Sequence, residues 1–191
     1  MPSKESRIVQ VGDPVLRGPC QPLSKHEIQS EVIQELIALM RDTMRDAPGV
    51  GLAAPQIGVP VQVAVIEDRV EYHKDIPPER LSERDRKPVP FHVIINPVIA
   101  FYGRPEVEFY EGCLSVAGFS ALVPRASHVR VECQNERSEP IVIEARGWYA
   151  RILQHEIDHL NGALYFDRML PLTLTTNQNL IKFGIMARVS K

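Results

Sequence analysis

The stretch Gln154-His155-Glu156-Ile157-Asp158-His159 decides how this 191-residue chain is interpreted. Its two histidines are four residues apart, so on a helix they lie on one face, where both imidazoles can bind the same cation. Glu156 is close enough to reach a metal-bound water without itself being a ligand. The stretch predicts a helix over Gly147–Asn161, capped by Gly162, that carries a metal site. The alternative is an exposed polar helix with solvated histidines, which the apolar neighbours on the same stripe disfavour.

Two histidines need a third protein ligand to complete such a site. Tyr165 stands where metzincin proteases have a third histidine, and beyond Asp167 the chain has no Asp, Glu or His. The third ligand is therefore upstream, unless it is Asp167. The upstream candidate is Cys113, because a thiolate binds zinc or iron(II) well and Gly112 allows a close backbone approach. The alternative is an inert packing residue, the commoner role of a lone buried cysteine.

Upstream of this helix, a second helical pattern is followed by a small-residue loop. Ser24 and Glu27 form a capping box, and apolar residues then recur at helical spacing, which predicts one amphipathic helix over Lys25–Arg45. The helix-breaking residues Pro48 and Gly49 follow its end, and Gly49–Gly58 is expected to be a loop.

The region between the two helices has the pattern of an antiparallel sheet. Pro97 is expected to end one of the strands, and the last two strands alternate β-branched residues on either side of a polar turn, which predicts a hairpin. The predicted strands are Val61–Glu67, Phe91–Asn96, Val107–Tyr110, Ala121–Val123, His128–Cys133 and Pro140–Ala145. Together these elements predict an α+β fold with antiparallel sheets around a central helix.

The chain is interpreted as a single domain over residues 1–191. The charged, proline-containing segment at about 69–90 is expected to be a surface insertion, and about 171–191 a C-terminal tail. A linker between two domains is the alternative for 69–90, but neither side alone has enough chain for a good core.

Composition disfavours several kinds of partner. A formal net charge of -2 gives no reason to expect nucleic acid or an anionic membrane. No apolar run approaches the roughly 20 residues of a membrane helix, and residues 1–10 lack a signal-peptide core. Three scattered cysteines favour a reducing compartment, with Cys20 and Cys133 interpreted as inert packing residues.

Three segments together resemble the peptide deformylase family: GVGLAAPQ at Gly49–Gln56, EGCLS at Glu111–Ser115 and QHEIDH at Gln154–His159. The similarity runs from about Ile8 to Leu170. It implies an α+β fold around the HExxH helix and a metal-dependent hydrolase that removes the N-formyl group from the initiator methionine of nascent proteins, releasing formate. It also implies iron(II) in the cell, with zinc, nickel or cobalt able to occupy the site.

The resemblance assigns roles to individual residues. Cys113, His155 and His159 would bind the metal, and Glu156 would carry a proton from water to the leaving amine. The side-chain amide of Gln56 and the backbone N–H of Leu114 would donate to the oxyanion. The expected substrate-binding residues are Val50, Gly51, Glu111, Gly112, Trp148, Arg151 and Ile152, the last three shaping a methionine pocket.

The chain also departs from the family's bacterial pattern. Ser120 stands where many bacterial members have an arginine paired with the motif glutamate, so Glu111 pairs with Arg125 instead, or with nothing. Ser115–Phe119 and the Gly147-Trp148 pair resemble the mitochondrial and plant-organelle branch, whereas EGCLS is of bacterial type. The expected compartment is a mitochondrial or other organelle matrix in a eukaryote, or the cytoplasm in a bacterium.

The expected partners are formyl-methionyl nascent peptides at the ribosome, for a monomer or homodimer, without direct nucleic-acid or membrane binding. Two rival functions stay open. A protease using the same metal chemistry is disfavoured by the missing downstream ligand, and an inactive binding module by the complete set of site residues. Assaying formyl-Met-Ala beside an unformylated peptide distinguishes a deformylase from a protease. Metal analysis together with turnover identifies an inactive binding module.

Overall fold

The computed structural model describes residues 8–103 and 107–183; residues 184–191 of the expected C-terminal tail lie outside the described residues. Two antiparallel sheets have the strand orders β1-β2-β3-β6-β7 and β4-β5-β8. The strands are β1 (Gly51–Ala53), β2 (Val63–Asp68), β3 (Val89–Tyr102), β4 (Val107–Cys113), β5 (Val116–Arg125), β6 (His128–Gln134), β7 (Pro140–Arg146) and β8 (Thr175–Thr176). The α-helices are α1 (Lys25–Ile28), α2 (Glu31–Asp46), α3 (Pro78–Glu83), α4 (Gly147–Leu160) and α5 (Asn177–Phe183). The predicted α+β class is confirmed.

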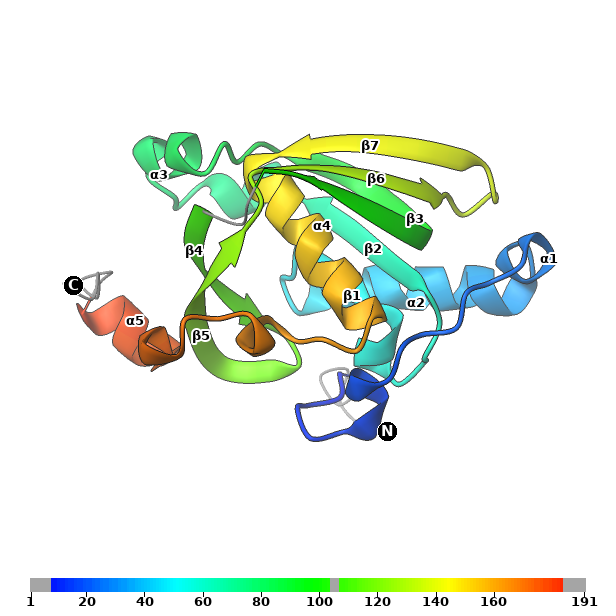
Figure 1. Cartoon of the computed structure of the whole chain (residues 1–191), viewed down its shortest axis with the longest axis horizontal. Helices are drawn as coiled ribbons and strands as arrows, with labels where there is room; N and C mark the ends of the chain where they lie inside the picture. Colours follow the sequence, from blue (N-terminus) through cyan, green and yellow to red (C-terminus); the bar gives the residue numbers. More distant parts are fainter. Residues whose placement is uncertain (1–7, 104–106, 184–191) are drawn as a thin grey trace.

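Helix α4 lies across one face of the five-stranded sheet, and α2 packs on the opposite face (Figure 1). The alternation of side chains along β2 explains both layers, because successive strand residues point to opposite faces. Ala64 and Ile66 belong to the buried cluster that contains Leu153 of α4, whereas Val63 and Val65 belong to the cluster formed with α2. The helix with the two histidines is therefore enclosed by the rest of the fold.

The predicted helix over Gly147–Asn161 is confirmed as α4, which ends at Leu160 with Asn161 as its cap. Gly162 has φ +74°, the left-handed conformation that glycine adopts most easily after a helix. The β6–β7 hairpin is also confirmed, with His128 opposite Arg146 and Gln134 opposite Pro140.

The prediction of one continuous helix over Lys25–Arg45 is wrong, because the chain forms two helices that meet at Ser30. The capping box at the start of α1 is present: the Ser24 N–H donates to Glu27 Oε2 over 2.7 Å, and the Glu27 N–H donates to Ser24 Oγ. Ser30 then caps α2, since its hydroxyl accepts from the Ile33 N–H and donates to the Glu27 carbonyl. A serine that hydrogen-bonds nearby backbone competes with helix continuation.

Pro97 does not end its strand, contrary to the prediction. A bulge between Ile95 and Val98 lets β3 continue, so that its first half pairs with β2 and its second half with β6. Asn96 takes φ +51° at this point, and its side chain hydrogen-bonds both backbone groups of Leu23. Bulges accommodate a proline that a regular ladder would exclude.

Three further segments contain secondary structure that the sequence did not predict. The loop predicted over Gly49–Gly58 contains the edge strand β1 and the 3-10 helix η3 (Ala54–Ile57). Segment 69–90 contains η4 (Val70–His73) and α3, and it meets α4 where the Trp148 N–H donates to the Arg84 carbonyl over 2.8 Å. Within 171–183, β8 pairs with β5, and α5 follows.

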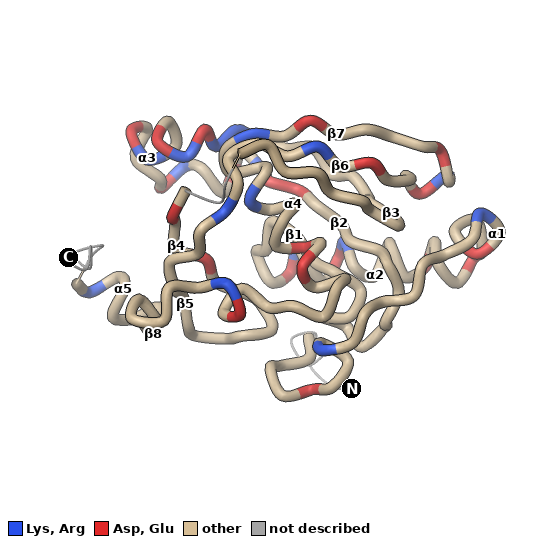
Figure 2. The backbone as a smooth tube through the Cα atoms, in the orientation of Figure 1, with Lys and Arg blue, Asp and Glu red and all other residues tan. Residues whose placement is uncertain are grey.

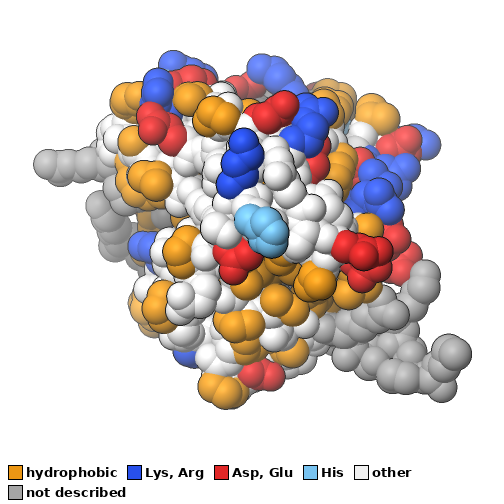
Figure 3. Space-filling view, turned by 90° about the vertical axis from the view of Figure 1, so that its right-hand side faces the viewer, with side chains coloured by type: hydrophobic (Ala, Val, Ile, Leu, Met, Phe, Trp, Pro, Cys, Tyr) orange, Lys and Arg blue, Asp and Glu red, His pale blue; other side chains and the backbone are white. Residues whose placement is uncertain are grey.

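Charges of both signs are distributed over the surface. Figure 2 shows acidic and basic residues together on α1, on α3 and on the β6–β7 hairpin. The face seen in Figure 3 carries both signs in its upper half, and hydrophobic side chains gather in its lower half. None of the helices in the described part of the chain is both long and apolar enough to cross a membrane.

Candidate active site and metal centre

Cys113, His155 and His159 bring their potential ligand atoms within 4.8 Å of one another. The Cys113 Sγ atom lies 3.3 Å from His159 Nε2, because a bulge at the end of β4 turns the thiol toward α4. Burial holds the pKa of His159 well below its ordinary value, which keeps the ring neutral and able to bind a metal. One thiolate and two imidazoles fit zinc or iron(II) with an open coordination position. Asp167, the alternative third ligand, instead binds Arg17 and the Leu164 N–H.

Glu111 orients the first histidine. His155 Nδ1 lies 2.9 Å from Glu111 Oε2, which leaves the other ring nitrogen to face Cys113. Arg125 binds the same carboxylate through two hydrogen bonds of 2.9 and 3.0 Å, so the expected Glu111–Arg125 pair is confirmed. Burial alone would raise the pKa of Glu111, but the hydrogen bonds from His155 and Arg125 hold it well below its ordinary value. The carboxylate is therefore anionic.

Arg151 provides Glu111 with a second guanidinium. It was expected to shape the methionine pocket, and it lines the cavity. Its Nη1 lies 2.6 Å from Glu111 Oε1, it donates to the carbonyls of Val107 and Val123, and its guanidinium lies 5.2 Å from the centre of the Phe109 ring. Ser120, which stands where bacterial members have an arginine, instead donates to Asn177. The second cation of this cluster thus comes from α4 rather than from β5.

A chain of ion pairs connects this cluster to the surface. Arg125 Nη1 binds Asp158, and Arg168 binds the same carboxylate through two hydrogen bonds of 2.7 Å. Asp158 is the fifth residue of the motif stretch, and sequence reasoning gave it no role. Separating β5 from α4 would leave a buried charge without its partner, which costs free energy. We therefore expect this series of ion pairs to keep the contact between β5 and α4 rigid.

Glu156 lies beside the metal site with a free carboxyl oxygen. Its side chain is almost fully buried, and Oε2 has no hydrogen-bond partner among the described residues. Burial raises its pKa to about 7. A Cβ atom on Gly51 would overlap this carboxyl group, so the glycine in β1 is what allows α4 to approach.

Gln56 is held in a single orientation on the other side of the site. Its Oε1 accepts from the Ala53 N–H over 2.9 Å, so its Nε2 must point toward Ser115 Oγ at 3.3 Å and Cys113 Sγ at 3.5 Å. The side-chain amide is therefore a preorganised donor beside the thiol. Ser115 had no assigned role, although it is the last residue of the EGCLS motif.

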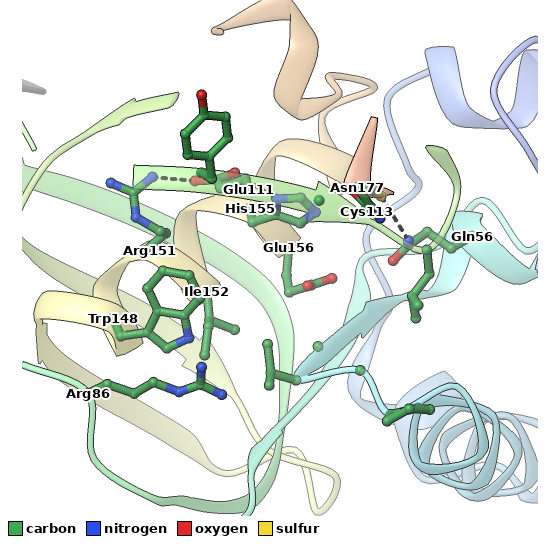
Figure 4. A pocket seen from close by; sticks show the side chains of 17 residues that line it. Gln56, Arg86, Glu111, Cys113, Trp148, Arg151, Ile152, His155, Glu156 and Asn177 are labelled. Atoms are coloured by element: carbon green, nitrogen blue, oxygen red, sulfur yellow. Dashed lines mark hydrogen bonds and ion pairs between the residues drawn. The ribbon is translucent and has the colours of Figure 1, made fainter. Parts of the chain in front are cut away.

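The predicted site residues, with the exception of the buried His159, line one cavity of about 380 Å³. In Figure 4, Gln56 and Cys113 lie at one end of it, Trp148 and Arg86 at the other, and Glu156 points into the space between. Sequence reasoning missed five lining residues: Pro48, Gly49, Arg86, Tyr110 and Asn177. Three of them adjoin or lie within the GVGLAAPQ and EGCLS motifs, but Arg86 and Asn177 carry no sequence signal.

Comparison with known proteins finds one family throughout. The family model described as Polypeptide deformylase matches residues 5–174. The chain is 49% identical to peptide deformylase 1A, chloroplastic, of Solanum lycopersicum over 91% of this chain, and it spans 62% of the length of that relative. It is 41% identical to the mitochondrial peptide deformylase of Homo sapiens, covering 89% of this chain and 70% of the relative. A crystal structure of class I type b peptide deformylase from Acinetobacter baumannii with Met-Ala-Ser bound superposes with a TM-score of 0.74 at 31% identity, covering 85% of this chain and 96% of that one.

Proposed function

This chain belongs to the peptide deformylase family, and from that premise we propose that it hydrolyses the N-formyl amide of formyl-methionyl peptides to formate and a free amine. The observation that supports this activity best is the position of Glu156. An unpaired, buried carboxyl oxygen lies beside a Cys-His-His group inside a cavity that is large enough for a side chain.

The residues at the metal-binding end of the cavity can perform both proton transfers of the reaction, from the attacking water and to the leaving amine. Cys113, His155 and His159 would hold one divalent metal ion, which when bound lowers the pKa of a water to about 7 and polarises a carbonyl. Glu156 accepts the proton of the attacking water at its free carboxyl oxygen and delivers it to the nitrogen of the departing peptide. Its pKa of about 7 suits both directions of transfer at neutral pH.

Two donors stabilise the charge that develops on the formyl oxygen. The Nε2 group of Gln56 is fixed by its carbonyl contact with Ala53, and the Leu114 N–H lies in the turn directly after Cys113. Removing one donor of this kind typically costs about 100–1,000-fold in rate. Gln56→Ala should fall in that range.

The wall around the metal end favours the smallest acyl group. A Cβ on Gly49 would lie 3.0 Å from Leu114 Cδ1, and a Cβ on Gly51 would overlap Glu156, so side chains fill this end tightly. We expect formyl-Met-Ala to release formate and acetyl-Met-Ala to be essentially inert, because its methyl group clashes there. Comparable hydrolysis of both peptides, or of an internal peptide bond, would contradict the proposal.

The metal proposed for the cell is iron(II), although zinc binds such sites more tightly. Zinc favours four ligands, whereas iron(II) accepts a fifth and leaves room for both water and substrate. Apoenzyme loaded anaerobically with iron(II) should be much faster than with zinc and should lose activity in air within minutes to hours, since thiolate and iron both oxidise. Nickel should give an active, air-stable form. Equal iron and zinc rates, or air-stable iron activity, would reject iron.

The proposed physiological substrates are nascent chains at the ribosome. A bound Met-Ala-Ser in the Acinetobacter baumannii relative supports methionine as the first residue. Names of the plant and human relatives support an organelle matrix as the compartment, with a bacterial cytoplasm as the alternative. Cosedimentation with ribosomes that carry formyl-methionyl chains tests the first point, and light scattering distinguishes a monomer from a homodimer.

A further inference from the structure

The end of the cavity farthest from the metal ligands is closed by an arginine clamped on a buried carboxylate. Arg86 Nε and Nη2 bind the two oxygens of Asp68, each over 2.8 Å. The Asp68 side chain is 0% exposed and that of Arg86 is 10% exposed, and His73 Nε2 lies 3.1 Å from the same carboxylate. A two-point contact of this kind fixes the plane of the guanidinium.

Trp148 completes this end. The Arg86 guanidinium lies 5.3 Å from the centre of the indole ring, within the range of a cation–π contact. The backbone N–H of Trp148 donates to the Arg84 carbonyl, and a Cβ on Gly147 would lie only 2.6 Å from that carbonyl oxygen. Gly147 therefore allows the segment with Arg86 to pack against the start of α4, which explains the Gly147-Trp148 pair noted in the sequence.

The charge balance determines which ligand this end can accept. Asp68 neutralises Arg86, so an anionic side chain gains little there. Nε and Nη2 of Arg86 are used by Asp68, whereas the indole Nε1 of Trp148 is a buried donor with no hydrogen-bond partner among the described residues. Val50 and Ile152 line the approach from the metal end with apolar surface. The cavity thus suits a long neutral side chain that carries a weak, polarisable acceptor near its tip.

We propose that Arg86, clamped by Asp68 and stacked on Trp148, is a specificity-determining residue that selects methionine over a hydrocarbon of the same length. The inference rests on the proposed function. A thioether sulfur is a weak hydrogen-bond acceptor and makes favourable contacts with aromatic rings. A methylene at the same place offers no acceptor to the Arg86 guanidinium or to the buried Nε1 of Trp148.

The test compares formyl-Met-Ala with formyl-norleucyl-Ala, which differ by sulfur against methylene. We expect wild-type kcat/KM to favour methionine by about 2- to 12-fold, the range that one net hydrogen bond gives. Asp68→Asn/Arg86→Gln replaces the ion pair by two neutral amides and should lower the ratio to the smaller preference that the Trp148 ring alone provides. Arg86→Lys, which keeps the charge but loses the planar two-point contact, should also lower the ratio, and it decides the matter if the double variant does not fold.

Arg84→Gln is the matched control. The Arg84 guanidinium also lies over Trp148, at 4.8 Å, but it lines a separate cavity, so its loss should leave the ratio unchanged. A wild-type ratio near one, or an unchanged ratio in both Arg86 variants, would overturn the inference.

A second readout does not depend on turnover. Trp148 is the only tryptophan of the chain, so its fluorescence reports on this end of the cavity alone. Met-Ala should change the emission at lower concentration than norleucyl-Ala does, and the double variant should reduce that difference. Formate release from neither formylated peptide would reject the proposed function itself, whereas release without discrimination would reject only the role of Arg86.

Discussion

The two ends of the cavity are built on the same interaction, a buried carboxylate held by arginine, but the two carboxylates act on different groups. Glu111 binds Arg125, Arg151 and the ring of His155, so it fixes a proposed metal ligand. Asp68 binds Arg86, so it fixes a guanidinium that lines the far end of the cavity. The consequence of breaking such an ion pair therefore depends on which group the carboxylate positions. The burial of the carboxylate alone does not indicate that consequence.

Cys113→Ser should have the largest effect on the metal end. A hydroxyl is a harder ligand than a thiolate and is poorly ionised at neutral pH, so metal binding should weaken and iron-supported activity should fall to background. Metal content and formate release, measured on the same folded sample, check this. Unchanged metal content and unchanged formate release would point to Asp167 or another residue as the third ligand. The two ends of the cavity would then no longer differ in the way proposed.

Glu111→Gln should have the next largest effect, because it releases the His155 ring. Loss of such a partner typically costs about 10–100-fold in metal affinity. Asp68→Asn is the matched control: it removes an equally buried carboxylate and should leave metal affinity within about twofold. Competition with a metal chelator measures both. A similar loss in the two variants would mean that both pairs act only through general stability.

A partly exposed pair should show the smallest effect. Arg45 of α2 binds Glu67 of β2 over 2.7 Å, with side chains 38% and 12% exposed, and this hydrogen bond lowers the pKa of Glu67. Arg45→Gln should therefore cost about 0.2–1 kcal/mol of unfolding free energy at pH 7. A lowered carboxyl pKa stabilises the fold above its unfolded value of 4.5, and this contribution is lost as the pH falls through the folded pKa. Denaturant unfolding at pH 7 and pH 3 should show the difference shrinking; a larger loss at pH 3 would contradict it.

The metal end could be predicted from the sequence because its residues lie in short motifs. His155, Glu156 and His159 share one turn of helix, and the caps of α4 are local signals. The third metal ligand could not be predicted from the helix motif, because a residue on a distant strand leaves no local spacing signal. Cys113 and Asp167 therefore both stayed open as candidates. The family resemblance selected Cys113, and the fold brings it to the histidines.

The far end could not be predicted, because its contacts join residues that form no motif. Asp68 directly precedes the charged segment 69–90 that was expected to be a surface insertion, and Arg86 lies within that segment. The role of Arg151 was also hidden, since its partner Glu111 lies 40 residues upstream. The errors in the fold have local causes: Ser30 caps a new helix within an apolar pattern that continues across it, and the bulge at Asn96 carries β3 past Pro97.

Glu156→Gln tests most directly whether the metal end performs the chemistry proposed for it. Wild type and variant are loaded anaerobically with iron(II), and bound metal and formate release from formyl-Met-Ala are measured on the same samples. Both should bind one metal ion per chain, because Glu156 is not a ligand, while the variant should be slower by about 100–10,000-fold, as expected for loss of a general acid and base. Near-wild-type turnover in the metal-loaded variant, or no formate from the wild type, would contradict the assignment.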